Sequence, residues 1–323
     1  MRVDEVTGGR RRGLLAVQIL VSAGLLVWIF SREGFRGDLL AVAGAARPGW
    51  LVAGAGVAGV VQGLCLLRWR IFLRMAGMPL GWRESVGLYF GGAFGGLFLP
   101  GGAGGDLVKI GLMAARGRDA AVAALSVLMD RLCGSLSMIL TGAGLIVWEF
   151  EWLTQGVAAG ALVRGVLVYL GVLVAVIGLS VGLCALGLAS RLPQWWPGRA
   201  RLIDLTGIFA RFFREWRTTV WAVALSCVML GLYFFTFYCA ARAYGVELPV
   251  ARFLALMPAV DILAGLPVSL GGLGVRESAF VLMLGQLAGV GAPVAVMVSL
   301  AGYLMSVLWA LPGAFLWIVR GPR

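Results

Sequence analysis

Long apolar segments separated by short charged stretches run through the chain. Six of them are long enough to predict membrane-spanning helices, which need about 17–25 residues: 14–30, 50–67, 120–148, 161–189, 219–243 and 293–318. Two more apolar segments, 84–115 and 253–288, are interrupted by glycine and proline. The pattern predicts an all-α polytopic membrane protein with about six spanning helices and two broken-helix hairpins.

The two interrupted segments share one design. The first has arms at 84–99 and 105–115, and the second arm is too short to cross about 30 Å at 1.5 Å per residue. The segment at 84–115 is therefore predicted to form a re-entrant hairpin, and the segment at 253–288 is predicted to form another. The residues of the breaks are Pro100, Gly101, Gly102, Gly104, Gly105, Pro267, Gly271, Gly272 and Gly274.

The order of the elements repeats along the chain. Helix, helix, hairpin and helix over 14–148 are followed by the same order over 161–318, starting from the opposite side of the membrane. This predicts an inverted-topology repeat, whose broken helices place a substrate site near the midplane. Glycine also permits close packing of membrane helices, so a plain eight-span bundle with two kinked helices is the alternative.

Composition and charge agree with a membrane protein and orient it. Hydrophobic residues make up 61% of the 323 positions and charged residues 13%, and the mean hydropathy is +0.95. A net charge of +12 would suggest nucleic acid as the partner of a soluble protein. Here 19 of the 27 Lys and Arg residues fall on one predicted side, as the positive-inside rule expects. We therefore predict cytoplasmic termini and no nucleic-acid partner.

The segments outside the two repeats are short. We expect a basic cytoplasmic tail at 1–13, an outer loop at 149–160 and a cytoplasmic tail at 319–323. Arg10 to Arg12 before the 14–30 helix resemble a signal peptide, but no small-residue cleavage site follows, so we expect a retained helix. Within 200–217, apolar residues recur at spacings of 3 and 4 opposite the arginines, which predicts an amphipathic helix on the inner surface.

Several kinds of chemistry are excluded by residue type. The chain has no histidine, which removes His-based acid–base catalysis, the Ser/His/Asp arrangement and His metal sites. The five cysteines lie singly in apolar segments without metal-like or redox spacing. We therefore expect no metal, no cofactor and no enzymatic activity.

Ionisable residues within the apolar segments are the candidate binding residues. Each would cost roughly 2.5–3.5 kcal/mol at the centre of a membrane helix if uncompensated, so they must pair, meet water or bind something charged. The candidate substrate-binding residues are Asp106, Lys109, Asp130, Arg131, Asp261, Arg276 and Glu277. Structural pairing within this set is the alternative to a function in binding.

Spacing suggests a role for some of these residues. Asp106 and Lys109 are three residues apart and share a helix face. Asp130 and Arg131 are neighbours, so a helix directs them towards different partners. Arg276 at the start of a short helix suits a phosphate, because a guanidinium and free backbone N–H groups both favour an anion.

Three motifs at these residues resemble the family named after the transmembrane region of lysylphosphatidylglycerol synthase, the flippase-domain type. They are Pro100-Gly101-Gly102-x-Gly104-Gly105-Asp106-x-x-Lys109, Asp130-Arg131-x-x-Gly134, and Pro267 followed by Gly271-Gly272-x-Gly274-x-Arg276-Glu277. Asp130 stands where the resemblance leads us to expect Glu. The resemblance implies lipid translocation or lipid-linked export in a bacterial inner membrane. The chain ends at Arg323, so we expect a stand-alone member without the synthase domain, similar to accessory proteins of envelope-lipid pathways, including hopanoid biosynthesis.

The resulting expectation is a transporter that moves an amphipathic or phosphate-bearing lipid between leaflets. Arg276 and Lys109 would hold the headgroup, Asp130-Arg131 would form a switching ion pair, and the two breaks would let the halves rock. Membrane lipids are the expected partners, together with envelope-lipid biosynthesis enzymes. A non-transporting scaffold of a biosynthetic complex, a lipid-modifying enzyme and a small-solute or ion-coupled transporter stay open.

Overall fold

The computed structural model describes residues 35–99, 104–185, 214–266 and 269–315, with five isolated residues at 24, 203, 206, 207 and 210. The elements are α2 (Phe35–Gly44), α3 (Pro48–Met75), α4 (Trp82–Gly96), α5 (Gly104–Ala115), α6 (Ala120–Ser137), the π-helix η1 (Met138–Gly142), α7 (Ala143–Trp148), α8 (Phe150–Leu153), α9 (Val157–Ala185), α12 (Trp216–Ala243), α13 (Val250–Gly265), the 3₁₀-helix η2 (Leu270–Gly272), α14 (Val275–Ala288) and α15 (Ala292–Leu308). The described chain has no strand, which confirms the all-α fold.

Five helical stretches are long and apolar enough to cross a membrane. They are Pro48–Met75, Ala120–Trp148, Val157–Leu179, Trp216–Ala243 and Ala292–Phe315. The polytopic membrane architecture is therefore confirmed. The predicted helix at 14–30, the tails at 1–13 and 319–323, most of 200–217, and the break residues Pro100, Gly101, Gly102 and Pro267 lie outside the described residues.

Three boundaries differ from the sequence prediction. The charged stretch between the predicted helices at 14–30 and 50–67 contains a further helix, α2. Helix α3 continues to Met75, eight residues beyond its predicted end, because Trp69, Phe72 and Leu73 keep an apolar face buried between the arginines. The predicted outer loop at 149–160 contains α8, and α9 begins at Val157.

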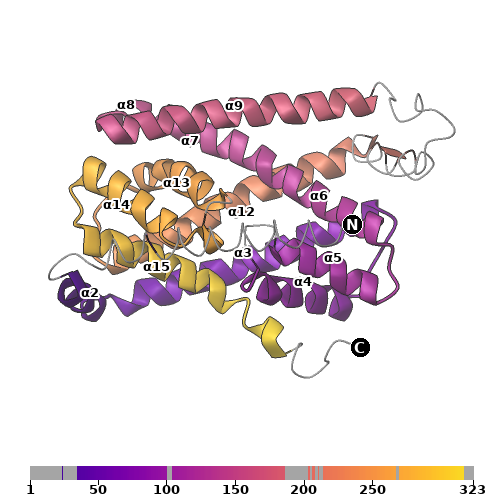
Figure 1. Cartoon of the computed structure of the whole chain (residues 1–323), viewed down its shortest axis with the longest axis horizontal. Coiled ribbons are helices and arrows are strands. Elements are labelled where there is room, and N and C mark those ends of the chain that lie inside the picture. The colour runs from indigo at the N-terminus through magenta and orange to yellow at the C-terminus, as the bar shows by residue number, and fades with distance from the viewer. Residues whose placement is uncertain are drawn as a thin grey trace, which may run out of the picture.

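The two glycine breaks each join a pair of short antiparallel helices. Helices α4 and α5 pack against each other, as do α13 and α14, and all four are shorter than the roughly 20 residues of a spanning helix. The α4–α5 pair and the α13–α14 pair lie at opposite ends of the long axis of the molecule (Figure 1). Helices α3 and α12 pack side by side along that axis between them.

Glycine brings the backbones of α4 and α5 into contact. A Cβ atom on Gly96 would lie 2.6 Å from the backbone N and Cα of Gly105, and one on Gly105 would lie 3.0 Å from the carbonyl oxygen of Gly92. Backbone atoms in two packed helices cannot give way as a flexible side chain can. The α4–α5 pair therefore depends on glycine at these positions.

We expect Gly96→Ala to lower the stability of the protein by about 1–3 kcal/mol, the usual cost of overpacking. Thermal unfolding of the purified protein in detergent measures this. The matched control is Gly111→Ala in α5, where an added Cβ meets nothing within 4 Å and should stabilise the helix by up to about 1 kcal/mol. Equal behaviour of the two variants would contradict the close backbone contact.

The two halves of the molecule have corresponding packing. Helix α3 packs against α4 and α6, while α12 packs against α13 and α15. In the same way, α5 packs against α6 and α14 packs against α15. The cross-contacts also correspond, because α3 contacts α15 and α12 contacts α6.

The largest buried apolar cluster fixes the α13–α14 pair against α12. The rings of Phe237 on α12 and Phe280 on α14 stack with centroids 5.8 Å apart, and Phe280 stacks on Phe253 of α13 at 6.4 Å. All three side chains are fully buried. This aromatic core sets the position of the polar residues that lie beside it on the same helices.

Candidate functional site

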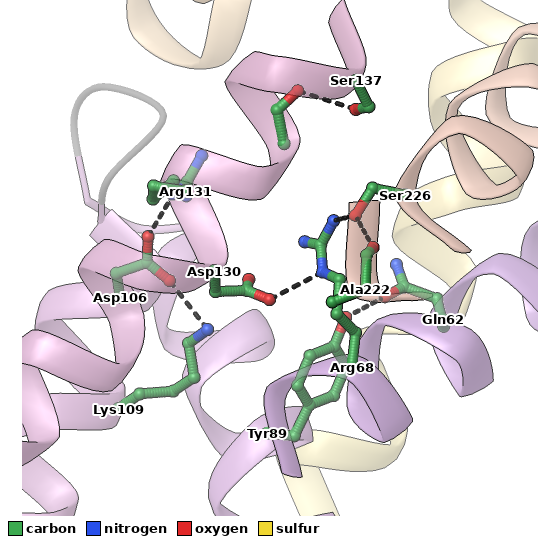
Figure 2. A network of polar contacts seen from close by, with 11 residues as sticks. Gln62, Arg68, Tyr89, Asp106, Lys109, Asp130, Arg131, Ser137, Ala222 and Ser226 are labelled. Atoms are coloured by element: carbon green, nitrogen blue, oxygen red, sulfur yellow. Dashed lines mark hydrogen bonds and ion pairs between the residues drawn. The ribbon is translucent and has the colours of Figure 1, made fainter. Parts of the chain in front are cut away.

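Asp106 is the centre of a group of charged side chains on α3, α5 and α6. Its carboxylate accepts hydrogen bonds from Lys109 Nζ at 2.7 Å and from Arg131 Nε at 2.5 Å. Asp130, beside Arg131 on α6, accepts a bond from Arg68 Nε of α3 at 2.8 Å. Figure 2 shows these five residues, Arg68, Asp106, Lys109, Asp130 and Arg131, which we call the Asp106 cluster.

Lys109 is buried among aromatic rings. Its ammonium lies 5.4 Å from the centroid of the Trp69 ring and 5.5 Å from that of Tyr89, and the residue is only 6% exposed. Its stem passes over Gly92 of α4, where a Cβ would meet Lys109 Cγ. The Asp106 carboxylate and the two ring faces together compensate the buried charge.

Arg68 directly follows the predicted helix at 50–67, and the structure places its side chain in the interior of the protein. It is 8% exposed, and its Nη1 donates to Ser226 Oγ of α12 at 2.7 Å in addition to the bond to Asp130. The Ser226 hydroxyl in turn donates to the Ala222 carbonyl oxygen (Figure 2). Arg68 thus joins α3, α6 and α12 through one guanidinium.

Asp130 and Arg131 bond to different helices, α3 and α5. The expected switching pair between these two neighbours is therefore replaced by two ion pairs to other elements, because successive side chains diverge around a helix. Arg131 differs from the rest of the cluster in exposure: its side chain is 56% exposed, against 10% for that of Asp106. It presents a positive charge at the surface of α6, 11 residues or about 16 Å from the start of the helix.

The second group of charged residues lies around the α13–α14 pair. Asp261 accepts a hydrogen bond from the Tyr233 hydroxyl of α12 at 3.1 Å. Arg276 donates from Nη2 to the Gly271 carbonyl oxygen at 3.1 Å, and its guanidinium lies 4.5 Å over the Tyr303 ring. We call Tyr233, Asp261, Ser269, Arg276 and Glu277 the Arg276 cluster.

Glu277 is held by two hydrogen bonds. One carboxylate oxygen accepts from the Gly274 backbone N–H at 2.6 Å, which caps α14, and the other accepts from Ser299 Oγ of α15 at 2.7 Å. The residue is 1% exposed. Glu277 therefore anchors the start of α14 to α15.

Two polar atoms of the Arg276 cluster have no hydrogen-bond partner in the described structure. They are Nη1 of Arg276 and Oγ of Ser269, in residues that are 8% and 1% exposed. Buried polar atoms are nearly always hydrogen-bonded. The turn before α14 contains three glycines with positive φ, at 271, 272 and 274. A Cβ on Gly272 would lie 3.0 Å from Nη2 of Arg276. An unpaired guanidinium N–H beside a glycine-lined turn suits an oxyanion.

The two clusters lie along one face of α12. Ser226 belongs to the hydrogen-bond network of the first and Tyr233 to the second. Residues seven apart share a helix face and lie about 10 Å apart along its axis. The π-helix η1 packs against both α12 and α13, and a Cβ on its Gly142 would lie 3.4 Å from Cβ of Pro258 inside α13. Two irregular helices therefore face each other beside α12.

Charge is distributed unevenly between the clusters. The Asp106 cluster has three cations and two carboxylates, whereas the Arg276 cluster has one cation and two carboxylates. The two clusters together contain four cations, including Arg68, and four carboxylates, so their summed formal charge is zero. One cluster is thus cationic and the other anionic by one formal charge.

The structure separates the seven candidate residues into two groups. Asp106, Lys109, Asp130 and Arg131 lie together, and Asp261, Arg276 and Glu277 lie around the other pair of short helices. Sequence reasoning missed Arg68, Ser226, Tyr233, Ser269 and Tyr303; polar residues within apolar helical runs were the available signal for the two tyrosines. Substrate binding by these residues stays a prediction.

The described residues contain no group of three or more His, Cys, Asp or Glu that could hold a metal ion.

Comparison with known proteins gives one family. A family model described as "Lysylphosphatidylglycerol synthase TM region" matches residues 15–313, nearly the whole chain. No curated protein and no solved structure matches the chain.

Proposed function

Because the chain belongs to the lysylphosphatidylglycerol synthase TM-region family, we propose that it moves an amphipathic lipid with a charged headgroup between the leaflets of a membrane. The headgroup would travel along the α12 face between the Asp106 cluster and the Arg276 cluster while the acyl chains stay in the bilayer. In this proposal the membrane is the bacterial inner membrane, both termini are cytoplasmic, and no covalent chemistry is performed. Partners are the lipid itself and the enzymes of envelope-lipid biosynthesis that supply it.

The observation that carries the proposal is the exposed side chain of Arg131. An arginine open to hydrocarbon at this depth is costly, and intramembrane charges as a rule face a water-filled cavity or a substrate pathway. Its partner Asp106 is buried, with a side chain 10% exposed, whereas more than half of the Arg131 side chain is accessible. A lipid headgroup with a negatively charged group is a suitable ligand for an accessible guanidinium.

The corresponding packing of the two halves supports an inverted repeat. Exchange of α3, α4, α5 and α6 with α12, α13, α14 and α15 maps the contacts between these helices onto one another. Such repeats alternate access by rocking one half against the other. The π-helix η1 and Pro258 in α13 supply two places where helices can bend.

Lipid movement in proteoliposomes tests the proposal. We expect Arg131→Gln to lower the rate of lipid exchange between leaflets about ten- to a hundredfold, because a charge-assisted hydrogen bond is worth about 1.5–3 kcal/mol. The assay follows a fluorescently tagged phospholipid with a membrane-impermeant quencher.

The matched control is Arg118→Gln, which changes an exposed arginine that pairs with Glu84 at 3.3 Å. It should keep the wild-type rate. Wild-type rates in inserted, folded Arg131→Gln protein and in Arg276→Ala protein would contradict the proposed route.

A further inference from the structure

The Arg276 cluster has too much negative charge to accept an anionic headgroup as it stands. Asp261 and Glu277 each contribute a carboxylate, and Arg276 is the one cation among these residues. An arriving oxyanion would add a third negative group around one guanidinium in a low-dielectric environment, where like charges repel strongly. Uptake of a proton by one of the two carboxylates removes this conflict.

Glu277 is unsuited to take up that proton. Both of its oxygens accept short hydrogen bonds, one from the backbone N–H that begins α14 and one from Ser299. Hydrogen bonds to the charged form stabilise that form. Protonation would also weaken the cap of the helix that carries Arg276.

Asp261 is placed to change its protonation state. Its carboxylate accepts one described hydrogen bond, from the Tyr233 hydroxyl, and Arg276 acts on it electrostatically without forming an ion pair in the described structure. Arg276 therefore has two competing partners, the Asp261 carboxylate and an incoming oxyanion. Binding of the oxyanion to Arg276 favours the neutral form of Asp261.

The surroundings of Asp261 contain few other charges. Helix α13 packs against α7, α8, α9, α12, α14, η1 and η2, and the groups on these elements that act on the carboxylate are Tyr233 and Arg276. Elements α7, η1 and η2 contain no titratable residue. Tyr303 of α15 lies against Arg276, and Arg252 and Glu149 pair with each other at the start of α13, about 13 Å from Asp261 by helical rise.

Two buried donors of the Arg276 cluster are the groups that an oxyanion would bind. Nη1 of Arg276 and Oγ of Ser269 are buried and have no described partner, and Nη2 is held by the Gly271 carbonyl oxygen. The Tyr303 ring supports the guanidinium from behind. Arg276 Nη1 and Ser269 Oγ are thus two buried donors that an anionic headgroup could satisfy.

We propose that the protein couples lipid movement to protons: an anionic headgroup binds Arg276 and Ser269 together with one proton on Asp261, and the two are released together. This inference rests on the proposed lipid transport and identifies the proton gradient as its driving force. The proton comes from water at the open side, binds a carboxylate oxygen of Asp261, and returns to water when the headgroup leaves. One positive and one negative charge move together, so the step is electrically neutral.

Proteoliposomes made with wild-type protein, phosphatidylcholine and a trace of acyl-tagged phosphatidylglycerol test this coupling. With one proton per lipid, a pH difference of one unit across the membrane should shift the leaflet ratio of the tagged lipid about tenfold. A potassium diffusion potential at equal pH should leave the ratio unchanged. Protein-free vesicles with the same gradients give the background.

Asp261→Asn removes the proton carrier and keeps the size of the side chain. We expect this variant to move the lipid without regard to the pH difference. It should respond instead to membrane potential, by about fiftyfold for 100 mV, because a single charge is worth about 2.3 kcal/mol there. Asp38→Asn, on the exposed part of α2, is the matched control and should behave as wild type.

The outcomes separate the two proposals. If the wild-type protein moves the tagged lipid but a pH difference leaves the leaflet ratio unchanged, the coupling is overturned and lipid transport stands. If the wild-type protein moves no lipid beyond protein-free vesicles, both are overturned. The wild-type measurement decides in either case, even if Asp261→Asn fails to fold.

Discussion

Replacement of Asp106 by asparagine is expected to cost about 3–5 kcal/mol of stability, because it leaves a buried cation without its carboxylate. Lys109 is 6% exposed and has Asp106 as its ion-pair partner, so among its described contacts the ammonium would keep the two aromatic rings. Urea or thermal unfolding of the purified protein in detergent measures the loss. Transport should fall in the same variant, since Arg131 also loses its hydrogen bond to this carboxylate.

Two comparison variants separate this effect from a general sensitivity to charge. Glu84→Gln breaks the ion pair with Arg118, in which the side chains are 28% and 40% exposed, and should cost less than about 1 kcal/mol. Adding Lys109→Met to Asp106→Asn removes the orphaned ammonium and should recover part of the stability. An equal loss in Glu84→Gln and Asp106→Asn would refute the interior position of the cluster.

The second large effect is expected at Arg68. Arg68→Met leaves Asp130 without its cation and Ser226 without its donor, and should likewise cost about 3–5 kcal/mol. The double variant Arg68→Met/Asp130→Leu replaces the whole pair by apolar side chains and should recover most of that loss. Unfolding measurements on the single and double variants form a double-mutant cycle.

The same cycle distinguishes a structural pair from a transport residue. Recovery of both stability and lipid exchange in the double variant would mean that the pair joins α3, α6 and α12 and has no contact with the lipid. Recovery of stability without exchange would place Asp130 or Arg68 on the lipid route. Additive losses would show that the two side chains do not interact, contrary to the 2.8 Å contact.

Much of the architecture could be predicted from hydrophobic length and glycine. Pattern alone located five spanning helices and the two pairs of short helices, since a spanning helix must be long and apolar. The predicted end of α3 was eight residues too early for a physical reason. Three arginines follow residue 67, but apolar residues at helical spacing between them continue the buried face of the helix. Helix α2 was missed because it is short and of mixed charge, so it has neither the apolar length of a spanning helix nor a glycine break.

The sequence allowed us to predict which residues are candidates for the site, but not how they are arranged in space. The cost of intramembrane charge singled out Asp106, Arg131 and Arg276, and the i, i+3 spacing paired Asp106 with Lys109. Contacts between helices distant in sequence, such as that of Arg68 with Asp130, depend on how the helices pack. Local patterns in a single sequence do not predict that packing. The division into two clusters of opposite net charge follows from the same packing.

Helix α9 adds a dependence on the bilayer itself. Its first turns pack against α7, α8, α13 and α14, but beyond Leu170 none of its residues with described burial is buried, and it runs along the upper edge of the molecule (Figure 1). A helix of 29 residues is about 43 Å long, against a hydrocarbon layer of about 30 Å. Such a mismatch is relieved by tilting or by local thickening of the lipid. Membrane thickness therefore acts on α9, and through its packed end on the α13–α14 pair that carries Asp261 and Arg276.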